Sequence, residues 1–211
     1  MRIALIDYGA GNLTSVRKAL RAVGGDVFVP GTPADIAEAD AVVIPGVGHF
    51  AATAVLDEPW RKAVLASVAS GCALLGICLG QQWLFDGSLE APEVPGLGLL
   101  SGRSVRLDGF GSRADCSGGW TVKIPHVGWN DLVMARPSAL LAGLPDGAQA
   151  YFTHSYALPV GPDTIATTAH GGTFSSAVEH GRVFGVQFHP EKSGEVGLTV
   201  LANFLRTAGS R

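Results

Sequence analysis

The chain has 211 residues, of which 47% are hydrophobic and 16% charged, and its formal net charge is −3. A chain of this length buries its apolar surface in one core or at most two, and no long linker divides it, so we predict one domain over residues 1–211. The near-neutral charge, without a cluster of lysine and arginine, argues against nucleic acid as a main partner.

The sequence also favours a cytoplasmic protein without a membrane span. No apolar stretch approaches the ~20 residues that a spanning helix needs. The apolar run at the N-terminus is too short before Asp7 to be a signal peptide. Three cysteines, an odd number, do not suggest a disulfide framework. We therefore expect a reducing compartment, in which a reactive thiol survives.

The first half of the chain alternates short apolar runs with amphipathic ones. Strands are predicted at 3–6, 27–29, 41–44 and 72–75, with helices at 13–23, near 36 and over 58–70. This alternation predicts a mostly parallel sheet with helices on both faces. Ligands bind such sheets at the carboxyl ends of the strands, so we expect the loops 7–12, 45–50 and 78–82 to gather at one edge.

The second half has a different spacing. Six strand-like runs follow one another like hairpins, so this part is predicted to be more antiparallel; they lie at 121–124, 132–134, 150–153, 164–168, 176–179 and 183–188. A glycine-rich stretch at 108–119 is predicted to be an exposed, mobile loop, and a helix over 198–205 closes the chain. The fold class is therefore α/β, with a mixed, mostly parallel central sheet and an antiparallel C-terminal part.

Cys78 is the candidate nucleophile. It lies between an apolar run and a predicted helix, and Gly76 and Gly80 flank it at two residues on either side. This spacing is typical of a nucleophile elbow, in which a Cβ at either glycine would collide with neighbouring backbone. The start of the helix favours the thiolate, the attacking species. Cys72 and Cys116 fit a core residue and a loop thiol better.

His189 is the candidate base that such a cysteine requires. It ends a strand-like run, and Pro190 keeps it extended. In extended chain, residues two apart point the same way, so the Glu191 carboxylate reaches the ring and fixes its tautomer. His170 and His180 are expected to be surface or structural residues. His49, His126 and His154 lie in predicted loops without metal-ligand spacing, so we predict no metal site and no cofactor.

With the run 76–80 around Cys78 and the run 189–191, the chain resembles the class I, triad-type glutamine amidotransferases. Within that class it is similar to the glutaminase subunits of imidazole glycerol phosphate synthase. Five runs carry this resemblance in order along nearly the whole chain: 7–13, 45–50, 125–130, 151–156 and 189–193. One departure is the glycine-rich stretch at 108–119, which is longer than usual.

The resemblance implies a flavodoxin-like fold and the hydrolysis of glutamine to glutamate and ammonia by Cys78, His189 and Glu191. The ammonia passes to a (β/α)8-barrel cyclase subunit of a heterodimer, which forms imidazole glycerol phosphate and aminoimidazole carboxamide ribotide in histidine biosynthesis. The resemblance also suggests glutamine contacts at Gln82, Ser155 and Tyr156. The oxyanion donors are expected at the amide of Leu79, the residue after the nucleophile, and in the glycine-rich loop at Gly46, Val47 and Gly48. The interface candidates lie on predicted loops near the site and are Asn12, Trp129 and Lys192.

Two details stay open on the sequence alone, and three rival functions are considered. A flexible 45–48 peptide could leave the oxyanion hole incomplete until the partner is loaded. Trp129 fits a core position as well as an interface, whereas Trp83 and Trp120 are expected in the core. The rivals are an amidotransferase of pyridoxal phosphate or anthranilate synthesis, a non-catalytic binding module of the same fold, and a cysteine hydrolase that acts alone on another amide.

Overall fold

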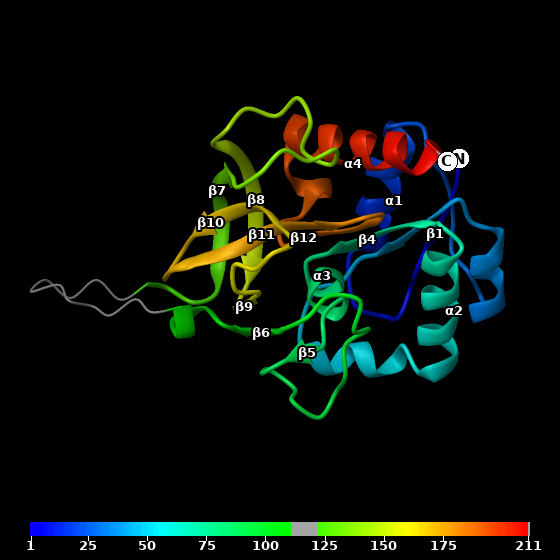
Figure 1. Cartoon of the computed structure of the whole chain (residues 1–211), viewed down its shortest axis with the longest axis horizontal. Coiled ribbons are helices and arrows are strands. Elements are labelled where there is room, and N and C mark those ends of the chain that lie inside the picture. Colours follow the sequence, from blue (N-terminus) through cyan, green and yellow to red (C-terminus); the bar gives the residue numbers. More distant parts are fainter. Residues whose placement is uncertain (111–121, 211) are drawn as a thin grey trace, which may run out of the picture.

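The computed structural model describes residues 1–110 and 122–210 (Figure 1). Its strands are β1 (Arg2–Leu5), β2 (Asp26–Phe28), β3 (Ala41–Ile44), β4 (Ala73–Ile77), β5 (Gly87–Ser88), β6 (Arg103–Arg106), β7 (His126–Met134), β8 (Ala148–His154), β9 (Tyr156–Ala157), β10 (Thr164–Ala169), β11 (Thr173–His180) and β12 (Val183–Val186). Its α-helices are α1 (Leu13–Ala22), α2 (Glu58–Ala69), α3 (Leu79–Trp83) and α4 (Gly194–Gly209). Four 3₁₀ helices are η1 (Pro33–Glu38), η2 (Phe50–Val55), η3 (Leu107–Phe110) and η4 (Pro190–Lys192).

Nine strands form one mixed sheet in the order β2-β1-β3-β4-β12-β11-β10-β7-β8. The first five pair in parallel. The remaining pairs are antiparallel. The predicted α/β class, with a parallel first part and an antiparallel C-terminal part, is confirmed. The last strand, β12, lies between β4 and β11 in the middle of the sheet, beside the strand that precedes Cys78.

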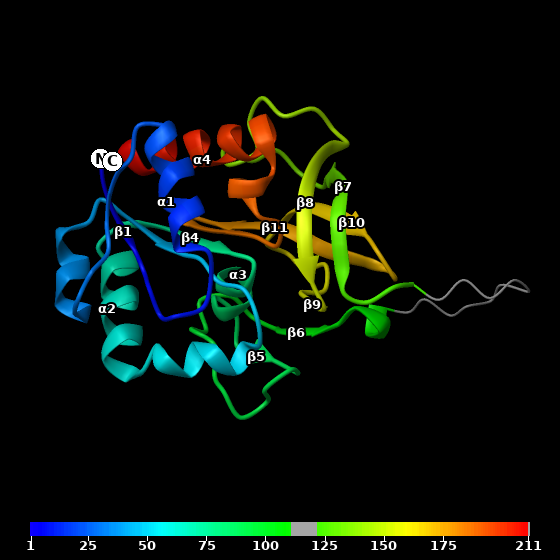
Figure 2. The same cartoon turned by 180° about the vertical axis from the view of Figure 1, so that it is seen from behind.

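Helices cover both faces of the parallel part. Figures 1 and 2 show α1 and α4 on one face and α2 on the other. Successive side chains of β1 divide accordingly, because Ile3 and Leu5 pack in one hydrophobic cluster and Ala4 in the second. Every residue of β3 is buried, as expected for a strand with helices on both sides. The loops that carry the predicted site residues of the first half follow the strands of this buried parallel part.

The loops at the carboxyl ends of the strands gather at one edge, as predicted. A Cβ built on Gly11 would lie 3.5 Å from the Cα of Gly46, so the loops after β1 and β3 touch. The amide of Leu79 donates to the carbonyl of Gly46 at 3.2 Å, which joins the loop after β3 to the elbow after β4. The parallel order of these strands brings three segments together that are far apart in the chain.

Three predicted elements are wrong in detail. Residues 122–124 are not part of a strand, and the run 125–130, predicted as a loop, forms most of β7. Its glycine and asparagine suggest a turn, but seven residue pairs with β8 hold it extended. Helix α4 is longer than predicted, and its inward face differs, since Leu198 is exposed while Leu201 is buried. Most of the glycine-rich stretch, together with Cys116 and Trp120, lies outside the described residues.

The other predicted elements are confirmed within a few residues at each end. Asn12 caps α1, because its side-chain oxygen accepts a hydrogen bond from the Ser15 amide at 3.2 Å. Pro33 occupies the first turn of η1, and Trp83 is buried in the core. Within 1–110 and 122–210, no helix is both long enough and apolar enough to cross a bilayer.

Candidate active site

Cys78 forms a strained turn between β4 and α3. Its backbone has φ 53° and ψ −107°, and it is the single non-glycine residue with positive φ in the described part of the chain. A Cβ on Gly76 would lie 2.6 Å from the Gly80 oxygen, and one on Gly80 would lie 1.8 Å from the Ile44 oxygen. Both contacts are with backbone, so the close approach of strand and helix requires glycine at both positions. The predicted elbow therefore exists, and its cysteine lines the cavity described below.

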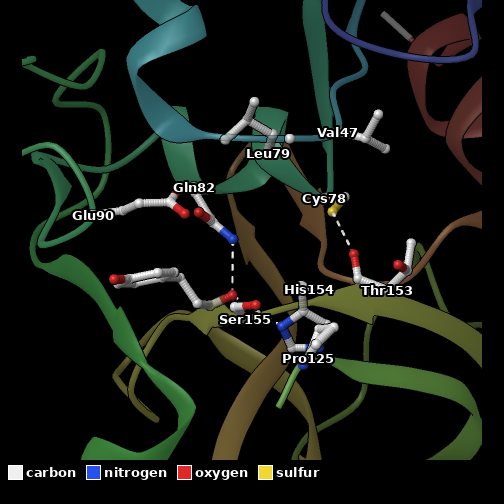
Figure 3. A pocket seen from close by; sticks show the side chains of 11 residues that line it. Val47, Cys78, Leu79, Gln82, Glu90, Pro125, Thr153, His154 and Ser155 are labelled. Carbon is white, nitrogen blue, oxygen red and sulfur yellow. Dashed lines mark hydrogen bonds between the residues drawn. The ribbon is translucent and has the colours of Figure 1, made fainter.

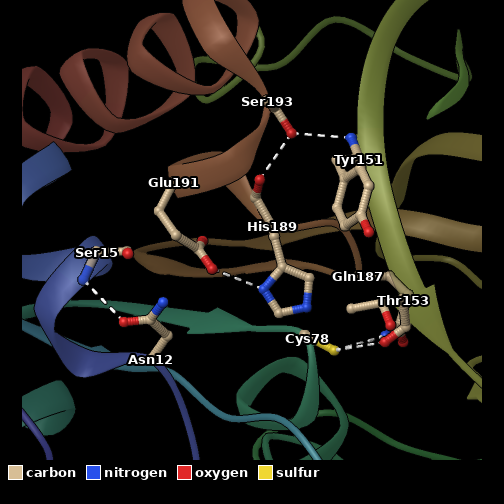
Figure 4. Close-up of polar contacts among 9 residues, drawn as sticks. All are labelled: Asn12, Ser15, Cys78, Tyr151, Thr153, Gln187, His189, Glu191 and Ser193. Carbon is tan, nitrogen blue, oxygen red and sulfur yellow. Dashed lines mark hydrogen bonds and ion pairs between the residues drawn. The ribbon is translucent and has the colours of Figure 1, made fainter. Parts of the chain in front are cut away.

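His189 and Glu191 form a buried pair beside this sulfur. The Nδ1 atom of His189 lies 2.8 Å from the Glu191 carboxylate, and both side chains are 2% exposed. Figure 4 shows the ring between Glu191 and Cys78. The backbone amide of His189 donates to the Tyr151 carbonyl at 2.8 Å, and the Ser193 hydroxyl donates to the His189 carbonyl at 2.7 Å. These two hydrogen bonds, one from the amide and one to the carbonyl of His189, fix the main chain of the base.

The charges around His189 favour its protonated form. Burial alone lowers the pKa of the ring, but the negative charge of Cys78 and a contact with its sulfur, followed by the Glu191 carboxylate, raise that pKa to about 10. The Nε2 atom is buried, and no residue in the described part of the chain gives it a hydrogen bond of ordinary geometry. Since Nδ1 is held by the Glu191 carboxylate, Nε2 is the ring nitrogen available for a proton transfer.

A cavity of about 280 Å³ opens onto the sulfur. Figure 3 shows it in close-up. Its lining residues come from the loop after β3, the elbow and α3, the loop after β5, the residue before β7, and the segment around the end of β8: Val47, Gly48, Cys78, Leu79, Gln82, Glu90, Pro125, Thr153, His154, Ser155 and Tyr156. The cavity has the size of a small polar metabolite and includes the three residues predicted to contact glutamine.

The predicted oxyanion donors meet at the same place, but the Leu79 amide is already hydrogen-bonded. The amide of Leu79, the first residue after the nucleophile, donates to the Gly46 carbonyl. Val47 and Gly48 line the cavity, and Gly46 lies against Tyr8, because a Cβ built on Gly46 would be 2.0 Å from the Tyr8 hydroxyl oxygen. A negatively charged oxygen at this site would need the Leu79 amide. The predicted oxyanion site is therefore closed in this arrangement, because the Leu79 amide is bonded to the Gly46 carbonyl.

Comparison with known proteins agrees with this geometry. The family model "Glutamine amidotransferase class-I" matches residues 4–208. The chain belongs to the class-I glutamine amidotransferases. It is 45% identical to the imidazole glycerol phosphate synthase subunit HisH of Moorella thermoacetica over 99% of this chain and 97% of that one. With the HisH subunit of Deinococcus radiodurans it shares 45% identity over 97% and 93% of the two chains.

Solved structures share the fold of this amidotransferase at low sequence identity. A crystal structure of a glutamine amidotransferase superposes with a TM-score of 0.72 at 22% identity and covers 98% of each chain. The structure of PurLQS from Thermotoga maritima gives a TM-score of 0.71 at 18% identity and covers 97% of each chain. This likeness shows that the overall fold is shared with these structures.

Sequence reasoning missed Glu90 in this amidotransferase. Its carboxylate is the one acidic side chain among the described residues that line the cavity, and one of its oxygens accepts a hydrogen bond from the Phe50 amide at 2.8 Å. The spacing of the acids in this loop gives no signal that could have indicated it. The motif runs included Pro125, Thr153 and His154, but no sequence signal indicated that these three residues line the cavity.

The three predicted interface residues lie at the edge of the site. Trp129 is 54% exposed, so it is not a core residue. It lies on strand β7, where a loop was predicted. Its ring packs edge-on against Tyr151, over which the Lys192 ammonium lies at 5.5 Å. Asn12 lies across the site at the cap of α1. Within the described ranges, no group of three or more His, Cys, Asp or Glu side chains could hold a metal ion.

Proposed function

We propose that this amidotransferase is the glutaminase subunit of an imidazole glycerol phosphate synthase. The observation that carries the proposal is 45% identity to HisH subunits over nearly the full length of both chains. The meeting of Cys78, His189 and Glu191 at a cavity supports a catalytic role and argues against a binding module that has only kept the fold. The partner would be the (β/α)8-barrel cyclase subunit that uses the ammonia.

In the proposed reaction, the Cys78 thiolate attacks the side-chain carbonyl carbon of glutamine. The new S–C bond gives a tetrahedral oxyanion, and His189 then donates its proton to the leaving nitrogen as the C–N bond breaks. Ammonia departs, and a thioester remains. His189 next takes a proton from water, whose oxygen attacks the thioester and releases glutamate and the thiolate. Glu191 keeps the ring in one orientation throughout.

Glutamine would be held by the polar groups that line the cavity. The Glu90 carboxylate is complementary to its α-ammonium group. Gln82 and the backbone of Ser155 and Tyr156 would contact its amide and carboxylate ends. The Gln82 side-chain nitrogen already donates to the Tyr156 carbonyl at 2.9 Å, so these two residues are fixed relative to each other before substrate arrives.

The closed oxyanion site supports regulation by the partner. Rotation of the peptide between Gly46 and Val47 would release the Leu79 amide and turn a second N–H toward the oxyanion. We expect the loaded partner to favour this rotation, since the loop belongs to the edge that carries the predicted interface. Equal glutaminase rates with and without the loaded cyclase would contradict this mechanism.

The experiment that tests the proposed function is co-purification with the barrel cyclase followed by a glutamine-dependent assay. We expect a 1:1 complex, and imidazole glycerol phosphate formed from glutamine at a rate that matches ammonia release. A hydrolase that acts alone would release ammonia equally well without the partner. An amidotransferase of another pathway would not bind the cyclase, so either result would reject the proposal.

A further inference from the structure

A second group of buried histidines lies next to the triad and has no part in the reaction above. His126, at the start of β7, and His154, at the end of β8, are 4% and 7% exposed. The Nδ1 atom of His126 lies 3.0 Å from Nε2 of His154. The Nδ1 atom of His154 lies 2.9 Å from the Tyr156 carbonyl oxygen, and the Asn130 amide nitrogen lies 3.2 Å from Nε2 of His126.

The partners at the two ends determine where every proton lies. The Tyr156 carbonyl only accepts, so His154 must carry its proton on Nδ1, and in a neutral ring Nε2 then accepts. His126 must therefore donate from Nδ1, which leaves its own Nε2 to accept from the Asn130 amide group. That group also donates to the Ala169 carbonyl at 3.1 Å, so both of its hydrogens are used. The hydrogen bonds run in one direction from Asn130 to Tyr156.

The chain of hydrogen bonds ends on an atom of the cavity wall. The Tyr156 carbonyl accepts from His154 and from the Gln82 side-chain nitrogen, each at 2.9 Å, so both of its lone pairs are occupied. We propose that Asn130, His126 and His154 are positioning residues that hold the Tyr156 carbonyl against Gln82 and thereby preform the glutamine site. The proposal rests on glutamine being the ligand of this cavity.

The surroundings of both rings keep them neutral, as the direction of the chain requires. Burial, with the charges of neighbouring histidines, lowers the pKa of His126 to about 4 and that of His154 to about 3. The titratable groups that face them are His170, stacked on His126 with ring centres 4.1 Å apart, and His189 beyond His154. A proton on either ring would set two N–H groups against each other and break the chain.

The first test measures glutamine binding by calorimetry in a Cys78→Ala background, in which hydrolysis does not obscure affinity. His126→Phe keeps the ring shape but leaves Nε2 of His154 without a donor, and we expect the Kd to rise about tenfold or more. His126→Asn places an amide N–H near the position of Nδ1 and should restore binding to within about threefold. His180→Asn, a change at an exposed ring, is the matched control and should have no effect.

The second test reads the protons directly, in nitrogen-detected spectra of the histidine rings of the full chain. We expect His126 and His154 both as neutral Nδ1–H tautomers, unchanged from pH 5.5 to 8.5. An Nε2–H tautomer, or titration in that range, overturns the proposal, and so does an unchanged Kd in His126→Phe. If the Cys78→Ala chain with intact histidines binds no glutamine, the proposed function fails instead, while the spectra still decide the hydrogen-bond chain.

Discussion

The elbow makes a quantitative prediction for Gly80→Ala. The added Cβ would lie 1.8 Å from the Ile44 oxygen and 2.8 Å from the Ile44 carbonyl carbon, both backbone atoms of β3. To reach ordinary contact, the first turn of α3 must move by more than about 1 Å, because β3 is fully buried and paired on both sides. Overpacking of this kind costs about 1–3 kcal/mol, and we expect the upper end, since no flexible side chain can yield.

The same displacement should reduce catalysis. Leu79 and Cys78 precede Gly80, so a shift of about 1 Å misplaces the sulfur relative to His189 and should lower kcat by about 100-fold. Urea unfolding and a glutaminase assay with the partner measure the two effects. Gly161→Ala is the control, because no heavy atom lies within 4 Å of its built Cβ and its φ is not in the left-handed region. If Gly80→Ala retains both stability within about 0.5 kcal/mol and full activity, the elbow reasoning is wrong.

Four further predictions address the triad, the neutral histidines, the cavity and the surface. Glu191→Gln should lower kcat by at least about 100-fold while KM stays within threefold, because the ring loses the carboxylate that orients it; an unchanged kcat contradicts this. Because the folded pKa values of His126 and His154 lie below the unfolded value near 6.5, the unfolded chain binds more protons below that pH. The free energy of unfolding should therefore fall from pH 6.5 toward 4. When this free energy is measured by urea titration at several pH values, its slope against pH should be shallower in His126→Asn than in the unchanged chain, by up to about 1.4 kcal/mol per pH unit. Glu90→Gln should raise KM for glutamine about tenfold or more with little change in unfolding, and an unchanged KM would remove Glu90 from the site. Trp129→Ala should weaken binding to the cyclase by about tenfold or more in a titration, and leave the glutaminase rate of the chain alone unchanged.

The parts of the fold that could be predicted are those in which local pattern and tertiary structure agree. All-apolar β3, the Asn12 cap and the two glycines around Cys78 each carry their structural reason in adjacent residues. The pairing of His189 with Glu191 could be predicted for the same reason, since only one residue separates them. Their meeting with Cys78 is expected from the triad pattern and the resemblance, because the spacing of the 183–188 run assigns it to the antiparallel part. In the structure β12 pairs in parallel with β4, which brings the two carboxyl ends together.

The features that could not be predicted depend on contacts made across the sheet. The run at the start of β7 looks like a loop because Gly128 and Asn130 weaken its strand pattern, yet β8 holds it extended. Glu90 reaches the cavity through a loop whose course no local signal gives. The direction of the hydrogen bonds through His126 and His154 depends on one carbonyl and one amide that only the folded chain brings together.

The most direct measurement compares two nitrogen sources for the Cys78→Ala complex with the cyclase. We expect no imidazole glycerol phosphate from glutamine, because the nucleophile is absent, and a normal rate from added ammonium, because the synthase reaction itself is untouched. Glutamine-dependent turnover at the wild-type rate would contradict the role of Cys78 and, with it, the catalytic site described above.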